Sequence, residues 1–399
     1  SHPDFLEAMQ PFVDWKRQKG IQTEIVDFST IGTTANQLKT YIQEQYDLND
    51  GLAFVQLVGD AAQIPSLSAS GGASDPSYAL LEGNDNYPDI FVGRFSAETV
   101  AQVETQVLRT IHYERDMATT DTWIPGGVGI GSSQGAGTGD DGEADWVHLN
   151  NIRNKLLIDV EPFYTYTAVD QIYDNNGGNA GMVTASLNEG RSIINYTGHG
   201  SNTSWSSTGF SNTHINQLIN DYKLPHIISV ACVNGNFTST TCFAEAWTRA
   251  TNNTTGAPTG AVAIYASSIN QSWAPPMAAQ DEIADIMVGL STYTLESRML
   301  LGGLYYSGSC LMMDEYGYDG ANTYKTWHIF GDCSLMIRSN VPEEMTVSHL
   351  PSLFIGLDTF TVNTEIAEAE VCLTYEGNIL GSAITDESGN AEIVLSDMP

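Results

Sequence analysis

A cysteine and a histidine each follow a short β-rich run in this chain, and glycines flank both. Residues 192–196 lead into Thr-Gly-His199-Gly, and residues 227–231 lead into Cys232-Val-Asn-Gly. The interval between His199 and Cys232 has room for one crossover helix, expected over 213–221. The two strands are therefore predicted to be parallel neighbours with both side chains at their carboxyl edge. An imidazole beside a thiol favours the thiolate, so the pair is a candidate for nucleophilic catalysis.

The glycines beside these two residues fit the same chemistry. They let a substrate approach the backbone, and we expect the amides of Gly200 and Cys232 to form an oxyanion hole. A buried cysteine or a single histidine at a strand end is more often structural, so neither residue alone indicates an enzyme. The pair leaves the catalytic and the structural interpretation evenly balanced.

Helices and strands alternate along the first 340 residues, which predicts a mostly parallel sheet with helices on both faces. Apolar residues with helical spacing predict helices over 3–20, 35–46, 98–115, 146–157, 243–250 and 280–290. Apolar, β-branched runs predict strands over 23–28, 52–58, 89–95, 127–131, 191–196, 226–231 and 260–266. This α/β class places ligands at the carboxyl ends of strands.

The pattern changes at Asn340-Val341-Pro342. Short strands and turns follow from Met345 onward, including 370–375 and 391–395, and predict a small β-sandwich. The segment has room for four or five strands where about seven are usual, so we expect an incomplete sandwich at Pro399. The expected domains are 1–120, an N-terminal α/β subdomain, 121–340, a catalytic α/β subdomain, and 341–399, the sandwich.

The composition excludes several classes of protein. The chain has 48 acidic and only 15 basic residues, a net charge of −33, so nucleic acid and anionic membranes are poor partners. No apolar run is long enough to span a membrane. The five cysteines have no zinc-ligand spacing, and their odd number leaves at least one thiol unpaired unless it bridges two chains.

Four long stretches, INYTGHGSNTSW, SVACVNGNF, CFAEAWTRA and PTGAVAIYASSINQSWAPP, resemble the gingipain cysteine peptidases, especially the Arg-specific type. The resemblance covers nearly all of residues 10–340. It implies a caspase-like α/β fold in two subdomains, followed by an immunoglobulin-like domain. It also implies that Cys232 is the nucleophile and His199 the general base and acid of a secreted or cell-surface endopeptidase, which would form a thioester acyl-enzyme. We expect a monomer that needs no catalytic cofactor.

The same resemblance implies the residues that select the substrate. Gly142-Glu143-Ala144-Asp145 matches the family motif whose Asp lies at the base of the S1 pocket, where a carboxylate can bind a guanidinium. The alternative role for Asp145 is to cap the helix expected at 146. Trp273 resembles the tryptophan that lines S1, with core packing as its alternative. Lys-specific relatives have an Asp where this chain has Pro276, which favours Arg as the substrate residue.

Two further features of the family concern a third catalytic residue and the binding of calcium. Gln134 occupies the position where the family usually has an acidic third catalytic residue, and an amide can orient an imidazole without stabilising its positive charge. Asp85, Asp89 and Glu245 match places where relatives bind structural calcium, and oxygen ligands suit Ca²⁺. Carboxylates in surface turns are the alternative for these three residues.

Two rival functions remain at this point. One is the same Cys–His peptidase with a different preference at P1, because the loop around Asp145 has changed. The other is a degenerate protease that serves as a surface binding module. The shortage of Lys and Arg also predicts resistance to autolysis if the enzyme cleaves after Arg, although a composition bias of the source lineage would look the same.

Overall fold

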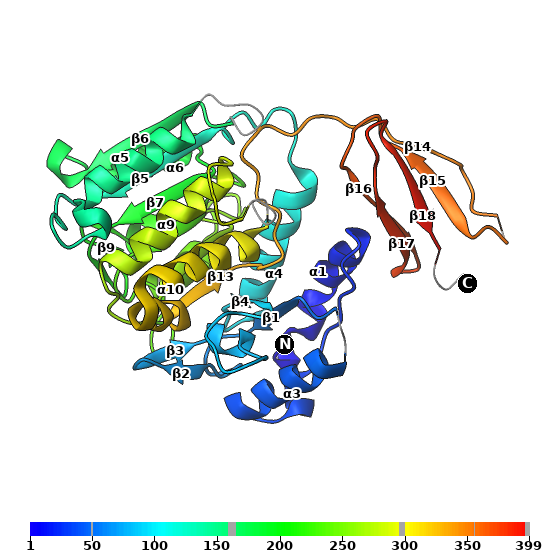
Figure 1. Ribbon diagram of the computed structural model, residues 1–399, viewed down its shortest axis with the longest axis horizontal. Coiled ribbons are helices and arrows are strands. Elements are labelled where there is room, and N and C mark those ends of the chain that lie inside the picture. The colour runs from blue at the N-terminus through cyan, green and yellow to red at the C-terminus, as the bar shows by residue number, and fades with distance from the viewer. Residues whose placement is uncertain (49–50, 159–164, 295–299, 355, 396–399) are drawn as a thin grey trace. The chain divides into compact units, whose positions relative to one another are not determined.

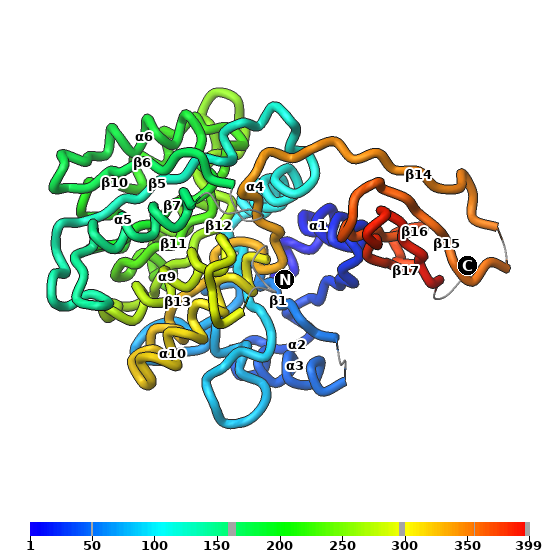
Figure 2. The backbone as a smooth tube through the Cα atoms, turned by 45° about the horizontal axis from the view of Figure 1, so that its top comes forward, coloured from blue at the N-terminus to red at the C-terminus, as the bar shows by residue number. Residues whose placement is uncertain are grey.

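An eight-stranded mixed sheet forms the centre of the larger part of the molecule (Figures 1 and 2). The computed structural model describes residues 1–48, 51–158, 165–294, 300–354 and 356–395. The strand order across the sheet is β1 (Phe54–Val58), β4 (Phe91–Phe95), β13 (Trp327–Phe330), β12 (Ala263–Ser267), β11 (His226–Val230), β7 (Ile193–Thr197), β5 (Gly126–Gly131) and β6 (Ala168–Tyr173).

The sheet consists of two parallel blocks that run in opposite directions. The strands from β12 to β6 are parallel to one another, and so are β13, β4 and β1, but β12 and β13 pair antiparallel. The carboxyl ends of the two blocks therefore lie at opposite edges of the sheet. The sheet is continuous across residue 120, where the sequence predicted a boundary between subdomains.

Helices cover both faces of this sheet, as predicted. Neighbouring residues of β11 show the two faces directly, because Ile227 and Ile228 belong to two different apolar cores. One core includes side chains from α5 (Asp145–Leu156), α9 (Ala274–Met287), α10 (Leu301–Lys325) and α3 (Ala35–Leu48). The other includes side chains from α6 (Ala180–Glu189), α8 (Phe243–Arg249) and α7 (Asn212–Ile215), and α4 (Val100–Ile111) packs against α8. Figure 1 shows α5, α9 and α10 together in front of the strands.

Short elements complete this part of the chain. They are the hairpin of β2 (Leu67–Ala69) and β3 (Gly72–Ser74), the small sheet of β8 (Gly200–Ser201), β9 (Ser204–Trp205) and β10 (Phe210–Ser211), and α2 (Phe28–Ile31). Single helical turns span Pro3–Phe5, Pro76–Ala79, His112–Asp116, Asp140–Gly142 and Asp174–Asn176. None of the helices in the described part of the chain combines the length and apolar composition that crossing a bilayer requires.

Two predicted elements are wrong. The strand predicted over 23–28 is absent: residues 21–27 form no strand, and Asp27 accepts a hydrogen bond from the Ser29 amide as the cap of helix α2, which begins at Phe28. The crossover between β7 and β11 contains only the four-residue helix α7 where the sequence predicted a helix over 213–221. Two apolar residues of this crossover, Trp205 in β9 and Phe210 in β10, are buried.

The smaller unit combines Leu6–Val26 with Pro342–Pro399. Helix α1 (Leu6–Gln18) packs against β16 (Glu370–Tyr375) and β17 (Asn378–Ile384), and the Cys372 thiol lies 3.7 Å from the Arg17 carbonyl oxygen. A second antiparallel sheet contains β14 (Ser348–His349), β15 (Thr359–Asn363) and β18 (Asn390–Val394). The change of structure expected near residue 341 thus coincides with a unit boundary, but this unit also includes a helix that the sequence assigned to residues 1–120.

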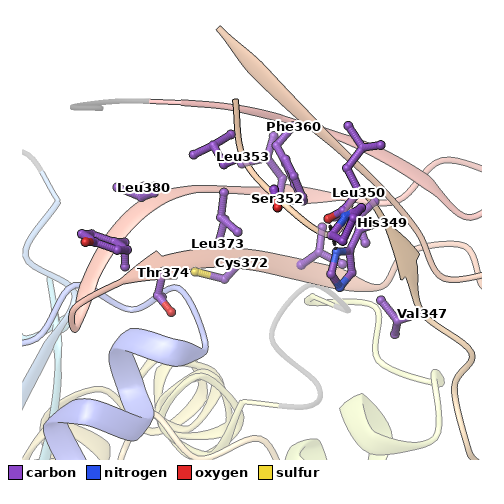
Figure 3. A pocket seen from close by; sticks show the side chains of 15 residues that line it. Val347, His349, Leu350, Ser352, Leu353, Phe360, Cys372, Leu373, Thr374 and Leu380 are labelled. Carbon is purple, nitrogen blue, oxygen red and sulfur yellow. Dashed lines mark hydrogen bonds between the residues drawn. The ribbon is translucent and has the colours of Figure 1, made fainter. Parts of the chain in front are cut away.

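Apolar side chains of both small sheets, Phe360, Val371 and Ile393 among them, form one cluster. Beside it lies a cavity of about 410 Å³ (Figure 3). Two packed antiparallel sheets agree with the predicted sandwich, and its immunoglobulin-like arrangement stays a prediction.

Candidate active site

The register between β7 and β11 places His199 and Cys232 at the same edge of the sheet. The two strands are parallel, and their last pair is Thr197 with Val230. His199 and Cys232 each lie two residues beyond this pair. The prediction that the two residues follow neighbouring parallel strands is therefore confirmed.

The imidazole of His199 is exposed and is oriented by two side chains. Its Nε2 lies 3.1 Å from Oε1 of Gln134, and its ring meets the indole of Trp273 edge to face, with centroids 5.0 Å apart. An amide oxygen only accepts hydrogen bonds, so Nε2 carries the proton in this arrangement. In the neutral ring, Nδ1 is then left as the basic nitrogen.

The loop that follows β5 connects Gln134 to Asp145 through backbone and side-chain hydrogen bonds. The backbone N–H of Asp145 donates to the backbone carbonyl of Gln134 at 2.9 Å, and the backbone N–H of Gln134 donates to the Ser132 hydroxyl at 3.1 Å. Gly135 permits this close packing, because it has a φ of +86° and a Cβ there would lie 2.6 Å from an Asp145 carboxylate oxygen. The loop thus brings Gln134 and Asp145, which are eleven residues apart, into one constellation with Trp273.

The Asp145 carboxylate is buried beneath this loop. It accepts hydrogen bonds from the Ser132 hydroxyl and, at 2.8 Å, from the indole N–H of Trp273. Burial raises the pKa of Asp145, and these two hydrogen bonds oppose the rise. Asp145 is the first residue of α5 and the cap position is Ala144, with no side-chain cap bond, so the helix-cap alternative does not describe this carboxylate.

Cys232 is half-buried and its thiol is free. Burial raises the pKa of the Cys232 thiol, and a hydrogen bond with the backbone of Gln271 opposes this rise. The next residue, Val233, has a φ of +50°, a strained conformation for a β-branched residue. Its amide donates to the Ile269 carbonyl at 2.9 Å, which holds the strained turn after Cys232 against the segment that follows β12.

Asn234 was not identified from the sequence, although the structure gives it a central position. Its side-chain amide is buried and donates to the carbonyls of Ser201, at 2.6 Å, and Ser204, at 3.2 Å. Its oxygen accepts from the Ser229 hydroxyl at 2.9 Å. Asn234 therefore joins the turn after Cys232 to the turn after His199. The only signal in the sequence was its place in Cys-Val-Asn-Gly.

Gly200 lies close to the backbone of Cys232. A Cβ on Gly200 would be 2.6 Å from the Cys232 carbonyl oxygen, so this approach requires glycine. Gly200 of β8 lies opposite Trp205 of β9 in an antiparallel pair, and the Ser206 amide donates to the His199 carbonyl beside it. This pattern marks Gly200 and Trp205 as a non-hydrogen-bonded pair of the ladder. The Gly200 amide therefore points away from β9.

The three candidate calcium ligands accept hydrogen bonds from other groups of the chain. Glu245 is buried and accepts from Arg249 at 2.5 Å, from the Ser96 hydroxyl and from the Cys242 amide. Asp89 accepts two backbone amides, and Asp85 accepts one. Within the described ranges, no group of three or more His, Cys, Asp or Glu residues could hold a metal ion. Glu245 fits an ion pair with Arg249 better than a metal site.

Basic side chains of the larger unit are almost all shielded from solvent. Of the described ones, Arg115 alone is exposed, and it forms an ion pair with the adjacent Asp116 at 2.6 Å. The others are buried or half-buried: Lys39, Arg94, Arg109, Arg153, Lys155, Arg191, Lys223, Arg249, Lys325 and Arg338.

Several known proteins are similar to this chain over nearly its whole length. Gingipain R2 of Porphyromonas gingivalis is 40% identical over 393 residues, which cover 98% of this chain and 52% of the relative. Gingipain R1 of the same species is 39% identical over 394 residues, 98% of this chain and 39% of the relative. Lys-gingipain is 24% identical over 421 aligned positions. The chain thus spans about half the length of gingipain R2.

Solved structures agree with the fold. The crystal structure of the Arg-specific cysteine proteinase gingipain R matches with a TM-score of 0.94 at 39% identity, over 99% of this chain and 90% of that one. A complex of the pro- and mature domains of the Porphyromonas gingivalis enzyme matches with a TM-score of 0.93. The predicted caspase-like α/β fold is confirmed. The model of peptidase family C25 matches residues 1–338, and with these relatives it shows that the chain belongs to that family.

Proposed function

We propose that this protein is a cysteine endopeptidase that cleaves after Arg. The observation that carries the proposal is the register of β7 and β11, which brings His199 and Cys232 to one sheet edge in a C25 chain. Similarity to gingipain R1 and R2 supports the choice of Arg. Asp145, a buried carboxylate that contacts Trp273, supplies the negative charge that recognises the guanidinium.

The proposed reaction begins with transfer of the Cys232 thiol proton to Nδ1 of His199, while Nε2 stays bonded to Gln134. The thiolate attacks the carbonyl carbon of the substrate Arg, and the carbonyl oxygen becomes an oxyanion. The Gly200 and Cys232 amides stabilise this oxyanion. Collapse breaks the C–N bond, His199 protonates the leaving amine, and a thioester remains. Water, deprotonated by His199, then hydrolyses the thioester and regenerates the thiol.

Gln134 acts in this scheme as an orienting group. Its oxygen fixes the ring of His199 by the 3.1 Å contact, but as a neutral amide it adds no charge to stabilise the imidazolium. Catalysis therefore depends mainly on the Cys232–His199 dyad. Secretion or cell-surface location, structural calcium and a monomeric state stay predictions.

A different preference at P1 is the second candidate function. It is favoured by the state of Asp145, whose carboxylate already accepts hydrogen bonds from Ser132 and Trp273. A guanidinium that binds Asp145 must therefore share the carboxylate with these two donors or displace them.

Cleavage of a mixed peptide library decides between the two functions, with Cys232→Ala as the inactive control. Cleavage after Arg supports the proposal, and dominant cleavage after another residue refutes it. If the protein is a binding module, it cleaves nothing, and Cys232 is not labelled by a peptidyl electrophile with Arg at P1.

A further inference from the structure

His148 is a fully buried histidine that the proposed reaction does not use. It lies in α5 three residues after Asp145, so the two residues occupy the same turn of the helix. Its Nδ1 lies 3.7 Å from a carboxylate oxygen of Glu143, in the loop before α5, and 3.6 Å from one of Asp281, in α9. Its Nε2 lies 3.1 Å from Oε1 of Gln280, also in α9.

The orientation of the Gln280 amide is fixed by its other partners. Its oxygen accepts from the Thr197 hydroxyl at 2.7 Å, and its nitrogen donates to the Asn195 side-chain oxygen at 3.0 Å. The atom facing Nε2 of His148 is therefore an acceptor. Both ring nitrogens of His148 thus face acceptors, a carboxylate pair on one side and an amide oxygen on the other. Nδ1 forms no hydrogen bond at these distances, so the two carboxylates favour the doubly protonated ring through its charge, while Nε2 can donate to Gln280.

We propose that His148 is a positioning residue for the substrate pocket. As an imidazolium it holds Glu143 of the loop and Asp281 of α9 together, and thereby fixes the start of α5 where Asp145 lies. Through Gln280 it also supports Thr197, the last residue of β7 before the His199 turn. The inference rests on the proposed function, since it concerns the pocket that recognises Arg.

The charges around His148 agree with this geometry. Burial alone would lower the pKa of His148, but Glu143, Asp281 and Gln280 outweigh it and raise the pKa above its ordinary value. Correspondingly, His148 lowers the pKa of Glu143. Two further carboxyls, Asp140 and Asp145, also interact with His148 electrostatically. Lys155 of α5 competes for Asp281, with Nζ 3.2 Å from its carboxylate.

The sign of the pH dependence follows from the raised pKa of His148. A histidine whose folded pKa is raised stabilises the native arrangement at low pH, and this contribution is lost as the pH rises through the folded value. The loop and the start of α5 then loosen. We expect the preference for Arg to weaken at alkaline pH, through a higher KM for Arg substrates and with little change in kcat.

The first experiment is an NMR titration of histidine side chains in the Cys232→Ala protein, which needs no activity. We expect the pKa of His148 to lie above that of an exposed histidine and to fall in a Glu143→Gln variant. The matched control is Asp141→Asn, which removes one charge from an exposed position of the same loop. A His148 that is neutral at pH 6, or that responds equally to both variants, overturns the inference.

The second experiment measures kcat/KM for paired peptides with Arg or citrulline, its neutral analogue, at P1 between pH 6 and 9. Taking the ratio cancels any pH effect on the chemical step itself, which both substrates share. We expect the Arg preference to fall about threefold to tenfold as the pH rises, and to fall at a lower pH in Glu143→Gln. A strong Arg preference that is constant with pH overturns the inference. An absence of Arg preference at pH 6 instead refutes the proposed function, and the titration still decides the protonation of His148.

Discussion

Replacing Asp145 by Asn tests the substrate pocket with almost no change of volume. In the native protein the carboxylate is buried and accepts hydrogen bonds from Ser132 and Trp273. An Asn side chain retains one oxygen, so it can satisfy only one of these donors in the same way. The rotatable Ser132 hydroxyl can accept from the new amide, which limits the destabilisation of the fold to about 1 kcal/mol.

The loss for Arg substrates is larger, because a desolvated guanidinium loses its charged partner. Removing one member of a buried, hydrogen-bonded charge pair costs roughly 2–5 kcal/mol. The lower half of this range applies here, because Ser132 and Trp273 already share the negative charge of Asp145. We therefore expect kcat/KM for Arg substrates to fall by about a hundredfold. In the native protein we also expect activity on Arg substrates to fall when acid protonates Asp145, because burial raises the pKa of this carboxyl.

The assay compares Arg and citrulline at P1 in otherwise identical fluorogenic peptides. The Asp145→Asn enzyme should lose the Arg advantage and retain most of its activity on citrulline. Asp141→Asn is the control, because it removes the same charge from an exposed residue of the same loop. An equal loss on both peptides, or an equal loss in the control, would show that Asp145 does not recognise the substrate.

The remaining predictions concern the dyad and the shielding of basic residues. Cys232→Ala should abolish cleavage and labelling by a peptidyl electrophile, whereas Cys242→Ala, a change in the buried core, should lower only the free energy of unfolding; an active Cys232→Ala enzyme refutes the assignment. His199→Ala should remove most turnover with little change in KM, since the leaving amine then has no proton donor; undiminished kcat contradicts the dyad. Thr254→Arg places Arg in an exposed turn, and mass spectrometry should find self-cleavage there unless Cys232→Ala is also present; if the active variant stays intact under conditions where it cleaves an Arg peptide, shielding does not explain resistance to autolysis.

The sequence predicted the strand ends well because their signals are local. The apolar runs before His199 and Cys232 are buried β7 and β11, and their length and spacing were sufficient to place both residues at one edge. Resemblance to relatives then selected Asp145, Trp273 and Gln134 as candidate site residues, and the structure brings these three together. No local pattern predicts that pairing, because it depends on how the loop after β5 folds back.

The unpredicted parts depend on contacts between distant residues. Helix α10 contains five glycines, which lower its helix propensity, and one of them, Gly308, allows close packing against α9. The four-residue strand β13 carries no signal for its direction, which pairing with β12 and β4 decides. Likewise, the periodicity of α1 predicts a helix but not the sheet against which it packs. His148 has no motif, and its role emerges only from the groups that α9 and the loop place around it.

The position of β13 has a consequence for folding during synthesis. Among the strands that the structure describes, the pair of β1 and β4 connects with the rest of the sheet only through β13, although more than two hundred residues separate β4 from β13 in sequence. At translation rates of roughly 5–20 residues per second, the block of β1 and β4 waits on the order of tens of seconds for its partner. During that time β4 has an unpaired edge, which can pair with other chains. The last strand of the sheet to be made is therefore the one that closes it, and nascent chains of this protein are most exposed to misassembly just before residues 327–330 emerge.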